Sequence, residues 1–367
     1  MTVEQISALI DVEGKVQRGE RLSFEDGVRL LQSHDLLHLG RMADLVRRRK
    51  NGDRAYFVVN THLNYSNVCW VDCKFCAFQR KLGQDGAYTL SLEEIQAWAK
   101  SQAGKGFREV HVVGGVHPAL PFEYYEDMMR LIKAELPEAH IQAFTAVEID
   151  YMCRHSKLSL EEGLSRLQAA GLGSLPGGGS EVFAQRVHDL AYPHKMTAGR
   201  WVEVHEAAHR LGIRSNASIL YGHIETPGEV IDHLCRLRDL QDRTGGFQTF
   251  LAFGFYPENT QLEKEFGLTE ATSGIDDLKM MAVARLMLDN FDHIKAFWMI
   301  MGPKLAQVSL NFGVDDLDGT VMEERIVHDA GAQGPRLQPK EAFIRAIRQA
   351  RRLPVERDTV FNVIREY

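Results

Sequence analysis

Short apolar runs alternate with longer amphipathic segments along this chain from about residue 55 to about residue 320. The runs that predict strands lie at 55–60, 109–114, 141–146, 173–177, 214–221, 248–254 and 294–300, and another is expected near 312–316. Between them, apolar residues recur three and four positions apart, as in amphipathic helices. Because helices usually connect parallel strands, this alternation predicts an α/β fold with a parallel sheet. Eight strands favour a (β/α)8 barrel of the TIM type, and a doubly wound open sheet is the alternative.

The segments on either side of the predicted barrel differ from it in pattern. Residues 1–52 are polar with helical apolar spacing and end at Gly52, so they predict an N-terminal helical extension. The barrel is expected to occupy residues 53–320. Residues 321–367 are expected to form a C-terminal helical segment that packs on the barrel.

Charge and hydropathy narrow the possible partners. The chain has 367 residues and a formal charge of −7, and it contains no long basic run. That balance argues against nonspecific nucleic-acid binding, which needs a cationic face. No stretch approaches the roughly 20 apolar residues that cross a bilayer, and the first residues contain no apolar signal-peptide core. We therefore expect a cytoplasmic protein with no nucleic-acid partner and no membrane span.

Three of the five cysteines lie within eight positions, as Cys69-x3-Cys73-x2-Cys76. Such crowding suits a metal centre better than a disulfide framework. Three thiolates on one loop can bind three corners of a [4Fe–4S] cluster and leave one iron open to a small molecule. A zinc site with His62 as the fourth ligand is the alternative. Cys153 and Cys235 are interpreted as inert.

The polar, glycine-rich and cysteine-rich segments each follow a predicted strand. These segments are 60–76, 114–118, 145–150, 176–181, 221–226 and 255–260. In a barrel of this type, the loops after the strands build the active site at one rim. Their shared placement predicts that the site lies at that rim.

The cysteine loop, with Phe75 before its last cysteine, resembles the signature of the radical S-adenosylmethionine (SAM) superfamily. The resemblance implies a radical SAM barrel with one cluster per chain. It also implies that SAM binds the open iron and yields a 5′-deoxyadenosyl radical. Phe75 would then face the adenine. The cofactor does the difficult chemistry, and the protein positions the radical.

Residues 55–335 are similar to the menaquinone and deazaflavin branch of that superfamily. Segments 114–118, 294–298 and 315–320 favour the aminofutalosine synthases of the futalosine route to menaquinone. The resemblance implies a carbon–carbon bond-forming transferase. It would add the radical to 3-[(1-carboxyvinyl)oxy]benzoate, giving 6-amino-6-deoxyfutalosine, methionine and bicarbonate, with SAM consumed. Tyr256 departs from the family, which has His there.

Two other functions remain open from the sequence. One is a radical SAM enzyme similar to cyclic dehypoxanthinyl futalosine synthase, which would abstract hydrogen and cyclise its substrate. The more distant one is a zinc-stabilised barrel that binds ligands without redox chemistry. A flavodoxin or ferredoxin is the expected electron donor for either radical enzyme, and it would dock near the cysteine loop.

The resemblance, together with placement on the predicted rim, indicates which residues bind the cofactor and the substrate. The expected cofactor contacts, besides Phe75, are Gly114, Gly115, Thr145, Glu148, Gly177, Gly178 and Gly179. The glycines would bring backbone close to SAM, with a tight strand–helix turn as the alternative for the first two. The expected contacts to the aromatic carboxylate substrate are His62, Asn64, His117, Arg200, Tyr221, His223 and Tyr256, with Lys195, Arg186 and Arg325 as weaker candidates. Either the N-terminal helices or segment 323–335 is expected to cap the barrel mouth.

Overall fold

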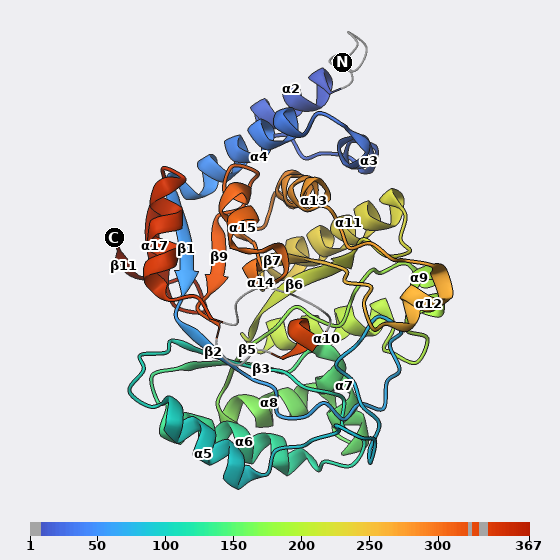
Figure 1. The fold of residues 1–367 in the computed structure, drawn as a ribbon, viewed down its shortest axis with the longest axis vertical. Coiled ribbons are helices and arrows are strands. Elements are labelled where there is room, and N and C mark those ends of the chain that lie inside the picture. Colours follow the sequence, from blue (N-terminus) through green and yellow to red (C-terminus); the bar gives the residue numbers. More distant parts are fainter. Residues whose placement is uncertain (1–8, 322–324, 330–336) are drawn as a thin grey trace.

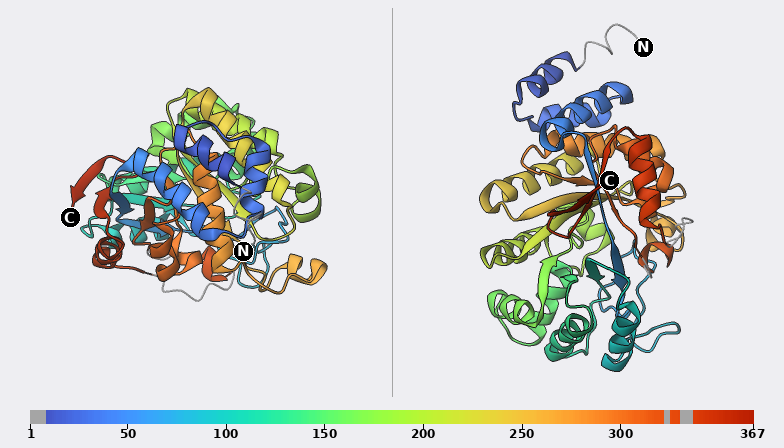
Figure 2. Two further views of the ribbon diagram at one scale, coloured as in Figure 1. Left: turned by 90° about the horizontal axis from the view of Figure 1, so that it is seen from above. Right: turned by 90° about the vertical axis from the view of Figure 1, so that its left-hand side faces the viewer.

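The computed structural model describes residues 9–321, 325–329 and 337–367 of the chain. Its strands form one curled and mostly parallel sheet with helices on the outside, as Figures 1 and 2 show. The strands are β1 Arg54–Val58, β2 Asn60–Leu63, β3 Glu109–Val112, β4 His140–Ala143, β5 Leu172–Leu175, β6 Arg214–Tyr221, β7 Phe247–Gly254, β8 Ile294–Lys295, β9 Asp316–Gly319, β10 Leu353–Arg357 and β11 Val363–Glu366. This arrangement confirms the predicted barrel class.

The described helices fall between these strands and at the two ends of the chain. They are α2 Ile10–Arg18, α3 Phe24–Gln32, α4 Leu36–Asn51, α5 Leu92–Gln102, α6 Phe122–Glu135, α7 Ala146–His155, α8 Leu160–Ala170, α9 Gln185–Ala191, α10 Ala198–Arg210, α11 Pro227–Thr244, α12 Gln261–Phe266, α13 Gly274–Met287, α14 Trp298–Met301, α15 Pro303–Ser309, α16 Ile326–Asp329 and α17 Lys340–Gln349. Within the described ranges, every helix is too short or too polar to span a bilayer.

Local sequence explains where many of these helices begin. Capping boxes, in which a Ser or Thr and the acidic residue three positions later satisfy each other's backbone amides, start α5, α7, α8, α11 and α13. Each box pairs donors that the first helical turn leaves free. Helices α7 and α11 follow strands directly, so these short polar motifs place their starts at the barrel rim.

The ring of strands closes through one continuous piece of chain. Strand β1 pairs with β9, whereas β2, which begins two residues after β1 ends, pairs with β3. The predicted strand 55–60 is therefore split at Val59 into two strands with different neighbours. As a result, segment 54–63 joins both ends of the parallel series from β3 to β9.

The C-terminal segment differs from its prediction. It contains the helix α17, but it also contributes β10, which pairs parallel with β1, and the antiparallel β11. The expected helix is present, and the two strands are an addition that the sequence pattern did not predict; Val355 is fully buried in β10. A short apolar run is stabilised there by a sheet edge that only the folded barrel provides.

A second difference concerns the predicted strand 294–300. Only Ile294 and Lys295 of this run form a strand, and the chain turns into α14 at Trp298. The Trp298 indole donates a hydrogen bond to the Gly319 carbonyl at 2.8 Å. This buried contact holds the aromatic residues in a turn at the barrel rim, although their β propensity favours a strand.

The N-terminal helices cover the outer wall of the barrel and not its mouth. Helix α4 packs on α13, and α3 packs on α11 and α13 (Figure 2). A Cβ on Gly40 would lie 2.7 Å from the Phe312 ring, so glycine permits this close approach. The other segment considered for the mouth, 323–335, lies largely outside the described residues, but Ile326 within it lines the central cavity described below.

Candidate active site

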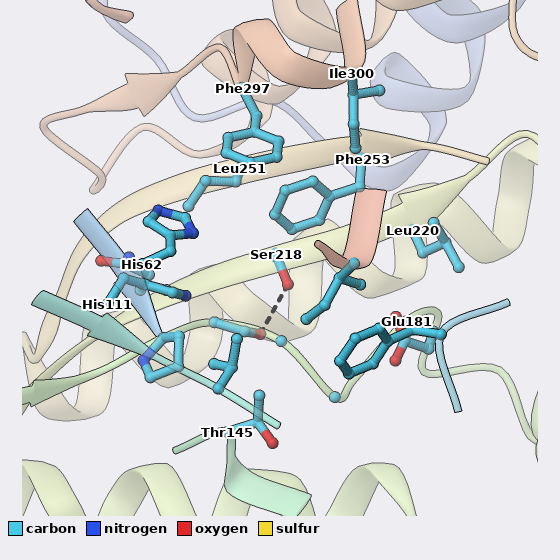
Figure 3. A pocket seen from close by; sticks show the side chains of 18 of the residues that line it. His62, His111, Thr145, Glu181, Ser218, Leu220, Leu251, Phe253, Phe297 and Ile300 are labelled. Atoms are coloured by element: carbon cyan, nitrogen blue, oxygen red, sulfur yellow. Dashed lines mark hydrogen bonds between the residues drawn. The ribbon is translucent and has the colours of Figure 1, made fainter. Parts of the chain in front are cut away.

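A cavity of about 340 Å³ lies inside the barrel and opens at the carboxyl ends of the strands. Its size is within the usual range for small-molecule sites. Nine of the predicted site residues line it, namely His62, Phe75, Cys76, Gly114, Thr145, Gly177, Gly178, Gly179 and Tyr256. Figure 3 shows His62 and Thr145 among the lining side chains. The rim rule for barrels therefore located part of the lining, and the rest comes mainly from the strands.

The cysteine loop runs from the end of β2 towards α5 and is fixed by backbone contacts. The Trp70 amide donates to the Val116 carbonyl at 3.0 Å, and the Val116 amide points at the Cys69 sulfur at 3.4 Å. Lys81 Nζ lies 3.1–3.3 Å from the carbonyl oxygens of Cys69, Trp70 and Val71. These bonds hold the loop backbone against the strand β3 extension.

The three thiols fit a cluster better than a single ion. Burial raises the pKa of Cys69, Cys73 and Cys76. Cys76 also raises the pKa of Cys69, and both Cys69 and Cys76 raise the pKa of Cys73, so the thiols are neighbours. Among the described residues, no three His, Cys, Asp or Glu side chains converge as a single metal ion requires. A cubane cluster binds each thiolate at a separate iron, so its ligands need only surround it.

The other two cysteines, and the histidine that a zinc site would need, lie away from this loop. Cys153 lies in α7 and packs against Gly163 of α8, and Cys235 lies in α11 beside Arg238. His62, the fourth ligand of the zinc alternative, stacks on His111 inside the barrel. The donor set at the loop is therefore three thiols, which matches three corners of a [4Fe–4S] cluster.

A buried ion pair lies beside the cysteine loop. Lys195 pairs with Glu181, and its ammonium lies 5.2 Å from the centre of the Phe75 ring. Burial alone would lower the pKa of Lys195, but Glu181 and Cys73 outweigh it and raise that pKa. Lys195 also lowers the pKa of all three cluster thiols. The charge of Lys195 thus favours the thiolate forms that an iron–sulfur cluster needs.

Glu181 is a lining residue that the sequence interpretation missed, and Lys195 appeared there only as a weak candidate. Glu181 ends the glycine-rich rim segment 176–181 and has a φ of +45°, which is uncommon for a residue with a side chain. Its position in that segment was the available signal. Its pairing with Lys195, fourteen residues away, was visible only in the fold.

Gly114 and Gly115 have different roles. Gly114 lines the cavity, but a Cβ on Gly115 would lie 2.3 Å from the Val68 carbonyl oxygen. The Gly115 amide donates to the Ser66 carbonyl at 2.8 Å. Gly115 therefore packs its backbone directly on the cysteine loop, and it is not among the residues that line the cavity.

Thr145 and Glu148 form the capping box of α7 and connect three rim segments. Glu148 is buried and accepts hydrogen bonds from Tyr65 Oη at 2.8 Å, the Gly114 amide at 3.1 Å and both the amide and hydroxyl of Thr145 at 2.7 Å. Burial raises its pKa to about 7, although these donors favour the charged form. Thr145 lines the cavity, and Glu148 supports it from behind.

The glycine segment 177–179 lies flat on β6. Ser218 Oγ donates to the Gly177 carbonyl at 2.7 Å, the bond dashed in Figure 3. A Cβ on Gly177 would lie 2.7 Å from the Ala217 backbone, and Gly179 has a φ of +105°. Only glycine allows both the approach and the conformation, so the segment presents bare backbone to the cavity.

The cavity has an apolar wall and a polar end. Leu251, Phe253, Phe297 and Ile300 form the apolar wall in Figure 3. We use the name lumen floor for the following polar residues, which line the cavity from the strands: Asn60, His62, Glu109, His111, Gln142, Asn216, Lys295 and Asp318. Of these, the sequence interpretation included only His62. The others sit within strands, where a polar residue facing a lumen resembles one facing solvent.

Five predicted substrate residues lie outside the cavity lining. Asn64 bonds to the Val113 carbonyl, and the His117 Nδ1 accepts from the Ala119 amide. Arg200 projects from α10 and pairs with Asp150 and Glu203, Tyr221 Oη donates to Asp277, and His223 bonds to the Leu220 carbonyl. Each of these five side chains is held by a hydrogen-bond or ion-pair partner that the sequence pattern did not reveal.

Two weaker candidates also lie outside the cavity. Arg186 pairs with Glu229 at the protein surface, and Arg325 lies over the ring of Tyr88. Tyr256 does line the cavity, and its hydroxyl donates to the Ile300 carbonyl at 2.8 Å. Of the predicted substrate contacts, the structure thus brings His62 and Tyr256 into the cavity.

A parallel barrel with three neighbouring thiols at its rim is typical of one class of enzyme, and two family models match this chain. Residues 63–237 match the radical SAM superfamily, and residues 244–366 match the C-terminal region described as CofH/MqnC. The chain also superposes on the crystal structure of methylornithine synthase with a TM-score of 0.74 at 21% identity, covering 94% of this chain and 97% of that one. That likeness concerns the fold.

Sequence relatives narrow the class further. An aminodeoxyfutalosine synthase from Thermus thermophilus is 48% identical over 97% of this chain and 96% of its own length. One from Streptomyces coelicolor is 43% identical over 97% and 94%. A cyclic dehypoxanthine futalosine synthase from the latter organism is 38% identical over 94% and 86%. The chain belongs to the radical SAM family that contains the aminodeoxyfutalosine synthases.

Proposed function

We propose that this chain is an aminodeoxyfutalosine synthase. The reaction joins the 5′-deoxyadenosyl group of SAM to the vinyl carbon of 3-[(1-carboxyvinyl)oxy]benzoate. It consumes one water and yields 6-amino-6-deoxyfutalosine, methionine and, from the carboxyl carbon that is lost, bicarbonate. Full-length similarity to two synthases of that name supports this assignment. The observation that carries it is the cysteine loop, which lines a cavity with apolar and polar walls through Phe75 and Cys76, while Cys69 and Cys73 lie on the same loop outside the lining.

Cys69, Cys73 and Cys76 would hold the cluster, which supplies the electron for reductive cleavage of SAM when it is bound. Phe75, Gly114, Thr145 and the segment 177–179 line the adjoining part of the cavity and would bind SAM. Bare glycine backbone suits a ligand rich in hydrogen-bonding groups, because amides and carbonyls can approach it closely. The ion pair of Lys195 and Glu181 balances charge beside the thiolates.

The apolar wall would receive the aromatic ring and exclude water from the reacting carbons. A reactive radical survives only where solvent and stray hydrogen donors are kept away. Phe253 and Phe297 meet edge to face with ring centres 5.5 Å apart, so this wall is firmly packed. A flavodoxin or ferredoxin near the cysteine loop would deliver the electron, in a reducing cytoplasm where thiols remain free.

The test is anaerobic turnover of the reconstituted protein with SAM, a chemical reductant and the enolpyruvyl benzoate. We expect one adenosine adduct per methionine formed, measured by liquid chromatography and mass spectrometry. Free 5′-deoxyadenosine without adduct would contradict the assignment. If a deuterated futalosine-derived substrate instead passed deuterium to 5′-deoxyadenosine, the cyclase activity of the 38% identical relative would be supported.

A further inference from the structure

Lys295 is a buried cation that faces the cavity from the lumen floor. It belongs to β8, and its Nζ lies 2.9 Å from Asp318 Oδ1 of the neighbouring β9. The side chains of Lys295 and Asp318 are only 5% and 7% exposed. An ammonium group carries three N–H donors. Within the described residues, Asp318 is the side chain that pairs with the Lys295 ammonium. The remaining donors are available to a ligand in the cavity.

Two stacked imidazoles lie at the same end of the cavity. The rings of His62 and His111 are 4.7 Å apart. His111 Nδ1 lies 3.1 Å from Gln142 Oε1, an acceptor, so the hydrogen is on Nδ1. Burial lowers the pKa of both rings and keeps them neutral. In the described part of the chain, His62 makes no side-chain hydrogen bond that would prevent its N–H from meeting a ligand.

The geometry of the proposed substrate decides which end reaches this floor. This step rests on the proposed function. The vinyl group must meet the 5′ carbon of SAM near the cysteine loop, so the ring and its carboxylate extend away from the loop. The ring would then lie along Phe253 and Phe297, which Figure 3 labels. The carboxylate would point to Lys295, which also lines the cavity. We propose that Lys295, together with His62, binds the benzoate carboxylate and makes the enzyme specific for a carboxylated ring.

The other charged groups at the floor leave room for this carboxylate. Glu109 already accepts a hydrogen bond from Asn60 at 3.1 Å. Asp318 shares Lys295 with the incoming group, and Arg357 nearby also stabilises the Asp318 carboxylate. An ammonium that bridges two carboxylates uses separate N–H groups for each. Lys295 is thus a substrate-binding residue with a fixed counter-ion, and Asp318 is a positioning residue.

The experiment compares two substrates in two variants. The first substrate is the enolpyruvyl benzoate, and the second is 2-phenoxyprop-2-enoate, which lacks the ring carboxylate. In Lys295→Met, we expect KM for the benzoate to rise roughly ten- to a hundredfold, as expected for a hydrogen bond to a charged group, while KM for the phenyl analogue stays within about twofold. The Kd of the benzoate, measured by calorimetry without reductant, should rise by the same factor.

A double variant tests whether the loss in Lys295→Met comes from misfolding. Lys295→Met leaves Asp318 buried without its cation, whereas Lys295→Met with Asp318→Asn removes both charges and should show the same selective loss. Asn tolerates the φ of +64° at position 318. The matched control is Lys50→Met, which breaks a pair with Asp292 at 3.3 Å on the outer wall and should change neither KM.

Each result separates the substrate assignment from the proposed reaction. Equal losses with both substrates, or an unchanged Kd for the benzoate, would overturn the role of Lys295. If wild-type protein binds the benzoate through Lys295 but forms no adduct, the carboxylate site stands and the synthase reaction is wrong. Iron content of each variant reports whether the cluster loop is intact.

Discussion

The rim and the lumen floor of this barrel are built in different ways. The rim consists of loops whose backbone contacts fix cysteines and glycines, as where Gly115 packs on Val68 and Gly177 on Ala217. The lumen floor consists of polar side chains that project from strands, as in the pair of Lys295 and Asp318. The rim presents backbone and sulfur, and the floor presents charge and imidazole.

This difference teaches where shared and particular functions lie in such a barrel. Backbone amides and thiolates recognise a cofactor common to a superfamily, because they do not depend on the side chains around them. Side chains on strands can differ between relatives without changing the loops, so they can adapt the floor to one substrate. Substitutions at the rim should therefore affect all turnover, and substitutions at the floor should affect substrate choice or pH response.

The largest effect is expected at the cluster ligands. Cys73→Ala should abolish cluster loading, because two thiolates cannot hold a cubane at three corners. Iron content and visible absorbance after anaerobic reconstitution measure this. Cys153→Ala is the control, since that buried cysteine of α7 lies away from the loop, and it should load normally. Equal losses in both variants would show that the ligands are misassigned.

The second largest effect is expected from a glycine substitution that displaces the backbone of the rim. Gly115→Ala should reduce SAM cleavage by about a hundredfold, because its Cβ would push Val68, next to Cys69, out of place. Production of 5′-deoxyadenosine measures this effect. Gly199→Ala in α10 is the matched control, because a Cβ there meets nothing within 4 Å. Similar cleavage by the two variants would contradict the close packing of the loop.

The pH dependence of stability should have opposite signs at the rim and at the floor. At the rim, burial raises the pKa of Glu148 to about 7, above its value in the unfolded chain. Its contribution to stability is therefore complete below the unfolded pKa and is lost as pH rises through about 7. That loss is about 3 kcal/mol. Thermal unfolding should show that Glu148→Gln loses less stability than wild type between about pH 4 and about pH 7, the unfolded and folded pKa values of Glu148.

A smaller effect is expected at the floor. Burial lowers the pKa of His62 below its unfolded value, so its contribution is present at neutral pH and is lost as pH falls below about 6.5. The loss is about 1.4 kcal/mol for each pH unit below that value. His62→Gln should lose less stability than wild type on acidification, as measured by Tm. If acid affects the two proteins equally, His62 is not held neutral in the fold.

Much of the site could be predicted from sequence because its chemistry is local. The spacing of Cys69, Cys73 and Cys76 depends only on a single loop, and Thr145 with Glu148 forms a capping box within one turn. The glycines that follow strands β3 and β5 mark the rim for the same reason. Arg200 and Tyr221 were placed at the site by proximity to strand ends, but their partners Asp150 and Asp277 hold them elsewhere.

The sequence by itself determined the class of barrel and the rim loops, since both follow from short-range spacing and periodicity, and it predicted Cys69, Cys73 and Cys76 as the cluster ligands. Only the tertiary structure decided the lumen floor, the pairing of Glu181 with Lys195 and the two C-terminal strands. Those features bring together residues that are distant in sequence. Their energies depend on burial and on charges from neighbouring strands, which exist only once the ring of strands has closed.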